Sequence, residues 1–311
     1  MRAVTGARSL ALERAGDAGF CIPIESGVIE TAVKFAHVAE SIGKPMSGLA
    51  GVLPAEKFRH RPVIVLSPHF DDACFALGGF LKALGHGILI NIFTRGAYVA
   101  RPDLAKVGIP PDGIHFIRDS EDREFARACG LRRYDLECEE PHLRGRRPSD
   151  MAAGLPDDIG QVEEKLLPLL LALAADEPAR PALFAPLGIG RHVNHRAVAE
   201  AVMGELKLLG DVFDLHFYED LPYASNPFHR LAALERLRSR VGKARRQVFV
   251  TPWREKRELI GVYQSQHRRT PSFTRFRPAA FPLAAHEAFW SLEQKNIKGV
   301  TPCSGIGPAS S

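Results

Sequence analysis

The amino-acid sequence predicts an α/β fold of the Rossmann-like kind, in which helices cover both faces of a mostly parallel sheet. Residues 63–66 and 88–93 are apolar runs of strand length without regular polar alternation, which is typical of strands buried on both faces. Residues 75–84 lie between them and are expected to form a helix. A helix that separates two buried strands indicates a parallel pair of strands with a crossover connection.

The same alternation continues along the chain. We expect further helices at residues 121–130, 162–175 and 195–209, and further strands at residues 182–185 and 214–218. Beyond residue 231 the chain is expected to be mostly helix and loop. In open α/β sheets the ligand site lies beyond the carboxyl ends of the strands, so functional residues are expected in the loops that follow residues 66, 93, 185 and 218.

Three parts of the chain differ in pattern. Residues 1–60 are interpreted as an N-terminal extension that is partly helical, because residues 29–43 have apolar positions at roughly helical spacing and lead into Gly-Lys-Pro, a helix stop. Residues 61–293 are expected to form the main domain. Residues 294–311 are interpreted as a C-terminal tail.

Composition excludes several classes of protein. Of the 311 residues, 45% are hydrophobic and 25% are charged, which is typical of folded globular proteins and not of collagen-like or disordered chains. The net charge is only +5. The most basic stretch, residues 236–257, is interleaved with and flanked by glutamates, so it is interpreted as a solvated helical face and no nucleic-acid partner is expected.

The sequence also bears on the compartment. No apolar run approaches the roughly 18 residues of a membrane span, and the first twenty residues contain several charges but no compact apolar region. We therefore expect a soluble, cytoplasmic protein without a cleaved signal. The five cysteines show no C-x-x-C spacing, and they are expected to be reduced, buried thiols.

Two motifs follow predicted strands and carry metal-ligand residues. Ser-Pro-His-Phe-Asp-Asp-Ala occupies residues 67–73, and Arg-His-Val-Asn-His-Arg occupies residues 191–196. Two imidazoles and one carboxylate, with a fourth position left for water, are the usual ligands of a catalytic zinc ion. His69 and Asp72 can point at one ion where a strand turns into a helix, and His195 can supply the third ligand from the neighbouring strand end.

The residues next to these ligands suit hydrolysis. Asp71 lies beside the predicted metal and can accept a proton from water, and His192 can stabilise an oxyanion or protonate a leaving amine. Each motif alone has a simpler explanation. Paired Asp residues often cap a helix, and the histidines of H-x-x-H at a helix start often serve as capping or surface residues. Their joint placement at two sheet ends favours the metal site.

In these motifs the chain resembles the PIG-L/LmbE family of zinc-dependent N-deacetylases over about residues 62–293. The resemblance also includes Gly78-Gly79, Arg118-x-x-Glu121, His142-x-Arg144, Phe-Tyr-Glu-Asp-Leu-Pro-Tyr at residues 217–223, and Tyr-Gln-Ser-Gln at residues 263–266. It implies a Rossmann-like deacetylase that removes an acyl group, usually N-acetyl, from an amino sugar or a related amine and releases acetate.

The resemblance also implies roles for single residues. The zinc ligands would be His69, Asp72 and His195, and another divalent metal such as Fe²⁺ remains open. Asp71 would be the general base, and His192 would stabilise the oxyanion. The resemblance places Arg118 and Arg144 toward the substrate pocket, although an arginine at such a position is about as often a structural ion-pair partner. Glu219 and Asp220 are interpreted as bracing the metal loops.

Three positions depart from the family pattern. Phe70 replaces a common proline, Ala73 replaces a common acidic residue, and Asn194 stands where the family more often has aspartate. An aspartate at that position would orient and charge His192, whereas asparagine supplies no charge. We therefore expect Asn194 to orient His192 while leaving it less readily protonated than in relatives.

Other functions remain open from sequence alone. The same site could cleave a thiol conjugate or a natural-product intermediate, because it hydrolyses any amide that its pocket admits. A non-catalytic glycan or metabolite binder could keep the fold, but four intact metal-site residues count against it. The expected partner is a small N-acylated molecule, in the first place a glycoside, and no oligomeric state is predicted.

Overall fold

The computed structural model describes residues 55–241, 243–266 and 271–293. Its strands are β1 (Val63–Ser67), β2 (Gly87–Asn91), β3 (Leu131–Asp135), β4 (Ala182–Pro186), β5 (Asp214–Tyr218), β6 (Ala244–Val250) and β7 (His286–Leu292). They form one sheet in the order β3-β2-β1-β4-β5-β7-β6. The first five strands are parallel, whereas β7 pairs antiparallel with both β5 and β6.

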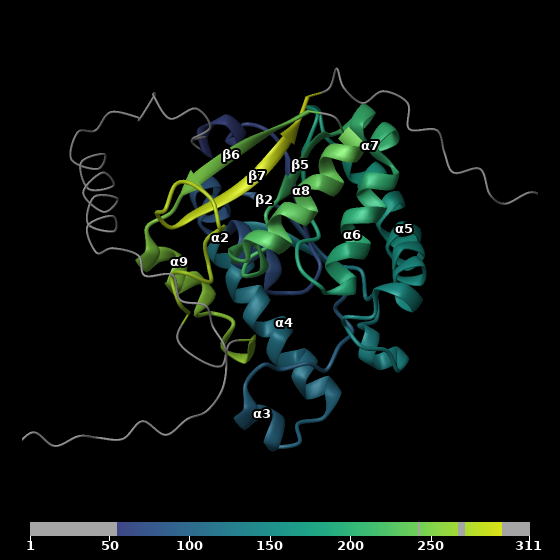
Figure 1. Ribbon diagram of the computed structural model, residues 1–311, viewed down its shortest axis with the longest axis vertical. Coiled ribbons are helices and arrows are strands. Elements are labelled where there is room, and N and C mark those ends of the chain that lie inside the picture. Colours follow the sequence, from purple (N-terminus) through teal and green to yellow (C-terminus); the bar gives the residue numbers. More distant parts are fainter. Residues whose placement is uncertain (1–54, 242, 267–270, 294–311) are drawn as a thin grey trace, which may run out of the picture. The chain divides into compact units, whose positions relative to one another are not determined.

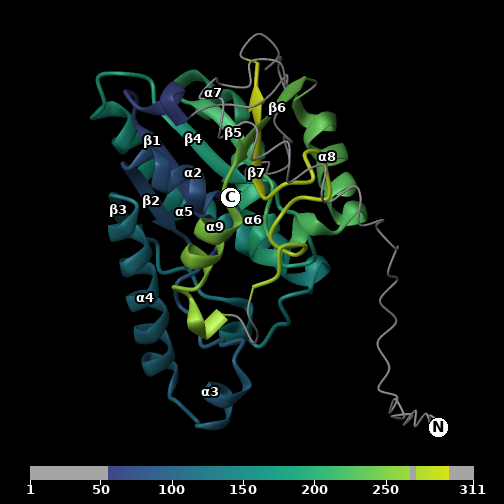
Figure 2. The same ribbon diagram turned by 90° about the vertical axis from the view of Figure 1, so that its left-hand side faces the viewer.

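Helices lie on both sides of this sheet. The α-helices are α2 (Asp72–Leu84), α3 (Pro102–Lys106), α4 (Pro111–Ala128), α5 (Met151–Ala175), α6 (Val193–Gly204), α7 (Leu206–Val212), α8 (Pro227–Val241) and α9 (Trp253–Ile260). Short 3-10 helices are η1 (Ala55–Phe58), η2 (Pro141–Arg144), η3 (Tyr223–Ser225) and η4 (Gln264–Gln266). Helix α2 packs against α9 on one side of the strands, and α5 packs against α6 on the other (Figures 1 and 2). The predicted α/β class is therefore confirmed.

Burial explains why the central strands form. Every residue of β1 and of β4 is buried, as expected for parallel strands covered on both faces. Phe184 of β4 lies 5.4 Å from Phe80 of α2 and 4.9 Å from Phe289 of β7, measured between ring centroids. Aromatic packing thus joins the parallel part of the sheet to its antiparallel edge.

The end of the chain differs from the prediction. Two strands, β6 and β7, lie beyond residue 231 among the helices and loops predicted there, and the sequence analysis missed both. The basic stretch 236–257 is also not one helical face, because it runs through the end of α8, all of β6 and the start of α9. Strand β6 is at the sheet edge, where exposed arginines are tolerated, and its sequence therefore lacks the apolar run of a central strand.

A buried ion pair fixes helix α2. Lys256 of α9 is paired with Glu287 of β7, and both side chains are almost fully buried. The Glu287 carboxylate accepts backbone N–H groups of Gly79 and Phe80, each at 2.8 Å, and Lys256 Nζ donates to the carbonyl oxygen of Cys74 at 3.2 Å. The helix that begins at the metal-site motif is thereby tied to two other elements.

Glycine is required at position 79 of this helix. A Cβ added there would collide with the side chain of Thr251. Of the Gly-Gly pair that follows the first motif, Gly79 therefore allows close packing of α2, whereas a Cβ at Gly78 would make ordinary contacts.

Several sequence predictions concern the thiols and the ends of the chain. Cys74, Cys129 and Cys138 are free and buried, and burial raises the pKa of each thiol. The remaining two cysteines, the predicted helix at residues 29–43 and the tail at residues 294–311 lie outside the described residues. None of the described helices combines the length and the apolar character of a membrane span.

His216 makes the stability of the fold depend on pH. Its ring stacks on Phe184 with 4.6 Å between centroids, Nδ1 lies 2.9 Å from Ser291 Oγ, and burial lowers its pKa from 6.5 to about 3. The unfolded chain takes up a proton at this site below its ordinary pKa, but the folded protein does not. Stability is therefore lost as the pH falls from about 6.5 toward 3.

We expect a His216→Gln variant to lose less stability in acid than the parent. Between pH 7 and pH 5, the free energy of unfolding of the parent should fall by about 2 kcal/mol more than that of the variant. This value follows because pH 5 is about 1.5 units below the ordinary histidine pKa, and each unit is worth about 1.4 kcal/mol. Urea unfolding at the two pH values measures this difference. Equal losses in the two proteins would show that His216 is not the group responsible.

Candidate metal centre

The two predicted motifs meet at the centre of the sheet. The first motif joins β1 to α2, and the second lies between β4 and α6. Strands β1 and β4 are hydrogen-bonded neighbours, while β2 and β5 continue the sheet in opposite directions. Such a reversal of strand order is where α/β folds place their ligands.

Three side chains converge there on one point. The possible ligand atoms of His69, Asp72 and His195 all lie within 4.8 Å of one another, and the three residues are buried. Asp72 Oδ2 lies 2.9 Å from His69 Nδ1 and 3.2 Å from His195 Nε2. These residues, hereafter the triad, were all predicted as ligands, and together they could hold a metal ion.

Asp220 orients His195 from behind. Its Oδ1 lies 2.8 Å from His195 Nδ1, and its Oδ2 accepts the backbone N–H of Ile189 at 3.1 Å. His195 Nε2 is buried and, although it lies 3.2 Å from Asp72 Oδ2, it makes no hydrogen bond among the described residues. Metal-ligating histidines commonly have this arrangement, with one ring nitrogen bonded to a carboxylate and the other facing the ion.

The electrostatic field at the triad favours positive charge. Burial alone would lower the pKa of His195, but the carboxylates of Asp72 and Asp220 outweigh it and raise that pKa to about 10. Burial alone would raise the pKa of Asp72, but its contacts with His195 and His69 hold it well below the usual range. A site that stabilises an imidazolium between carboxylates also suits a cation.

Asp71 lies beside the triad and contacts a buried arginine. Arg118 Nη2 is 3.9 Å from Asp71 Oδ1, and Arg118 Nη1 donates to Glu140 Oε1 at 2.7 Å. Burial, followed by the charge of Asp72, raises the pKa of Asp71 to about 6, although Arg118 opposes this shift. A carboxylate with such a pKa can accept a proton near neutral pH.

His192 is the residue just before α6, and its side chain lies next to the histidines of the triad. Its ring centroid lies 4.6 Å from that of His69 and 5.5 Å from that of His195. Its Nδ1 is buried, and no described residue forms a hydrogen bond with it. Burial and the charges of the two neighbouring histidines lower the pKa of His192 well below its ordinary value.

Two further predicted residues have direct contacts, and that of Arg144 is the structural ion pair that the sequence left open as an alternative to substrate contact. The Asn194 amide nitrogen lies 3.0 Å from His69 Nε2, so its contact is with a triad residue instead of with His192. Arg144 forms an ion pair with Asp158 at 2.6 Å and donates to the carbonyl oxygen of Glu139 at 3.0 Å. These contacts join Arg144 to α5 and to the segment before η2.

Other motif residues position the site from outside. Glu121 accepts the backbone N–H and the hydroxyl of Ser265, at 2.8 and 2.6 Å, and so ties α4 to η4. Glu219 is bonded to Arg230, Arg246 and Trp290. Of the two residues predicted to brace the metal loops, Asp220 contacts such a loop directly, whereas the contacts of Glu219 are with α8, β6 and β7.

Sequence reasoning missed Tyr223 as a neighbour of the triad. Its ring lies edge to face against His195, with 5.1 Å between centroids. The available signal was its place three residues after Asp220, in a segment that already contributed to the family resemblance.

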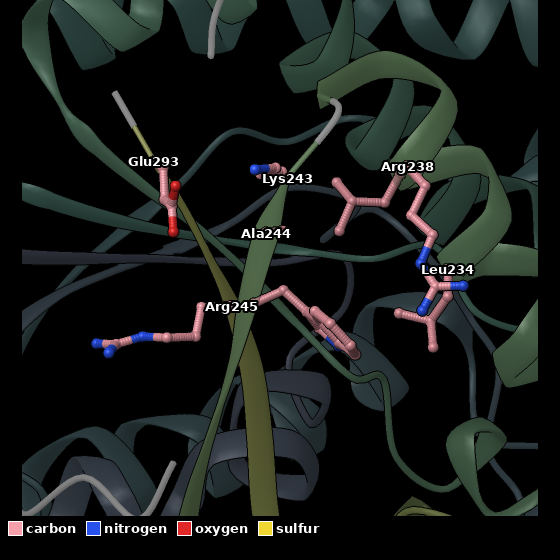
Figure 3. A pocket seen from close by; sticks show the side chains of 8 residues that line it. Leu234, Arg238, Lys243, Ala244, Arg245 and Glu293 are labelled. Carbon is pink, nitrogen blue, oxygen red and sulfur yellow. The ribbon is translucent and has the colours of Figure 1, made fainter. Parts of the chain in front are cut away.

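A hollow lies elsewhere in the described structure. It has a volume of about 370 Å³ and is lined by residues of α8, β6 and β7, with Arg238, Lys243 and Arg245 as its cations. Figure 3 shows the side chains of Arg238 and Arg245 extending to opposite sides of β6. These cations do not point toward one ligand position, so the hollow is a weaker candidate for the functional site than the triad.

Comparisons with known proteins support a deacetylase-like fold. No family model matches the chain. A 2'-N-acetylparomamine deacetylase from Streptomyces fradiae is 32% identical over 176 residues, which cover 54% of this chain and 60% of that protein. The matched part thus spans less than two thirds of the relative's length.

Solved structures of two other deacetylases share the fold. The A40926 pseudoaglycone deacetylase superposes with a TM-score of 0.53 at 18% identity and covers 76% of this chain and 98% of its own. The zinc-inhibited form of teicoplanin deacetylase gives a TM-score of 0.52 at 16% identity and covers 75% and 98%. At these identities the likeness concerns the fold alone.

Proposed function

We propose that the protein is a metal-dependent hydrolase that removes an N-acyl group, in the first place N-acetyl, from an amino sugar or a related amine. The observation that carries this proposal is the convergence of His69, Asp72 and His195 with a second carboxylate, Asp71, beside them. The sequence similarity to a 2'-N-acetylparomamine deacetylase supports the same reaction class. The domain that performs it is proposed to be residues 61–293.

The triad is proposed to hold Zn²⁺. Two imidazoles and one carboxylate suit this ion, although Fe²⁺ accepts similar ligands. His195 Nε2, which is buried and makes no hydrogen bond among the described residues, fits a ligand role. Asn194 is proposed to orient His69 with its amide turned so that the oxygen accepts the Nε2–H, which leaves Nδ1, beside Asp72, as the ligand atom. A divalent ion bound there would acidify a water molecule and polarise the acyl carbonyl.

The remaining chemistry is assigned to the protein's own side chains. Asp71 accepts a proton from the attacking water, and Arg118 holds the Asp71 carboxylate in place. His192 donates a hydrogen bond to the oxygen on which negative charge develops. Water adds to the acyl carbon, the C–N bond breaks, the amine takes the proton that Asp71 accepted from the water, and acetate is the second product.

Arg118 and Arg144 were both predicted to contact substrate. The contacts of Arg118 favour a positioning role toward Asp71. The ion pair of Arg144 with Asp158 favours a structural one. Substrate contact by either arginine stays a prediction, as does a cytoplasmic location.

Acetate release tests the proposed function. Zinc-loaded protein is incubated with 2'-N-acetylparomamine, with other N-acetylated amino-sugar glycosides, with an N-acylated thiol conjugate and with an N-acetylated alkylamine. We expect acetate and free amine in equal amounts from at least one glycoside, and a faster reaction with it than with the thiol conjugate. Metal-loaded protein that releases no acid from any of them would contradict the proposal.

A further inference from the structure

Tyr223 lies beside the triad with its hydroxyl unused by the described part of the protein. The ring packs against His195 and against the backbone of Gly190, where a Cβ would lie 2.9 Å from two of its ring atoms. The fully buried hydroxyls of Tyr218 and Tyr263 instead donate hydrogen bonds within the protein, at 2.8 and 2.6 Å. The Tyr223 hydroxyl is therefore available to a ligand.

Tyr98 presents a second aromatic ring at the same edge of the sheet. It is 53% exposed and lies in the loop after β2. The backbone is held on both sides of it, because the Ala97 N–H donates to His142 Nε2 at 3.0 Å and the Ala100 N–H donates to the Ser265 carbonyl at 2.9 Å. An exposed ring on a fixed backbone loses little conformational entropy when it binds.

The sheet order places these tyrosines on two flanks of the triad. The triad comes from the loops after β1 and β4, whereas Tyr98 follows β2 and Tyr223 follows β5. All four loops leave the carboxyl ends of neighbouring parallel strands. Contacts also link the Tyr98 loop to the centre. His142, which accepts the Ala97 N–H, has its Nδ1 3.4 Å from Glu140 Oε2, and Glu140 pairs with the Arg118 that contacts Asp71.

We propose that Tyr98 and Tyr223 form an aromatic binding site that holds a sugar ring of the substrate beside the triad. The electron-rich face of a tyrosine attracts the C–H face of a sugar, and a phenol hydroxyl can bond to sugar hydroxyls. The inference rests on the proposed function and narrows it to glycosides over N-acylated alkylamines. Tyr98 and Tyr223 would then set specificity.

Binding is the direct test, and it is measured apart from turnover. In zinc-loaded protein carrying Asp71→Asn to prevent hydrolysis, calorimetry gives the Kd of 2'-N-acetylparomamine. Adding Tyr98→Ala should raise Kd about 10-fold, the effect of losing one favourable aromatic contact. Tyr98→Phe should recover most of that loss, and Tyr223→Phe should weaken binding about 3-fold or more through its hydroxyl.

The control is Phe228→Ala on α8, since Phe228 is 79% exposed, and its Kd should match that of the parent. An unchanged Kd for Tyr98→Ala, or no binding of the probe by the parent, would overturn the aromatic site. Acetate release by protein with Asp71 intact separately decides the proposed function. The two measurements are therefore independent: the binding test can contradict the aromatic site while acetate release supports hydrolysis, or the binding test can support the aromatic site while acetate release contradicts hydrolysis.

Discussion

An Asp71→Asn variant is expected to lose at least about 10³-fold in kcat while it still binds metal, because the amide cannot accept the proton of the attacking water. Asparagine has nearly the same shape, so the contact with Arg118 should survive in part. Acetate release and metal content, measured on the same preparation, separate the two effects.

Asp103→Asn provides the matched control for this prediction. Asp103 lies on α3 with its side chain 58% exposed and is paired with Arg101, so its loss should leave kcat and metal content unchanged. If Asp71→Asn kept more than a tenth of the parent's kcat, Asp71 would not be the general base.

Lys256→Met is expected to destabilise the protein by about 3–5 kcal/mol, because it leaves the Glu287 carboxylate buried without its cation. The loss should be seen as a lower urea midpoint with little change in the slope. Replacing both partners, as Lys256→Met with Glu287→Leu, removes the unpaired charge but also the acceptor for two α2 N–H groups. We therefore expect the double variant to recover only part of the loss.

A second lysine gives the control. Lys82 of α2 lies 3.7 Å from Glu255 of α9, and both side chains are more than one third exposed, so Lys82→Met should cost less than about 1 kcal/mol. Equal destabilisation by the two lysine substitutions would show that burial of the Lys256 pair does not matter.

The sequence was sufficient for four of the five parallel strands, β1, β2, β4 and β5. Strands β1, β2 and β4 each contain at most one polar residue, and their burial on both faces makes them recognisable. Strand β5 carries Asp214 and His216 but is otherwise apolar and almost fully buried. Strand β3 has the sequence Leu-Arg-Arg-Tyr-Asp at one sheet edge, and β6 is rich in arginine at the other. Edge strands need only partial burial, so neither has an apolar signal.

The convergence of the triad was predictable because the positions of its residues are set locally. His69 and Asp72 lie within one motif, and His195 is placed by a strand end that the sequence also indicates. The partners of these side chains were harder to predict. The contact of Asn194 with His69 joins residues 125 positions apart. It depends on the direction of the Asn194 side chain at the start of α6, and a sequence pattern does not predict that direction.

Metal binding by the triad is the most direct test of the account. Zinc titration and elemental analysis of the parent should give one ion per chain. His195→Ala should lose this ion, whereas His192→Ala, three residues away on the same segment, should keep it and lose only turnover. A parent that binds no divalent ion, or a His195→Ala variant that binds it as tightly as the parent, would contradict the account.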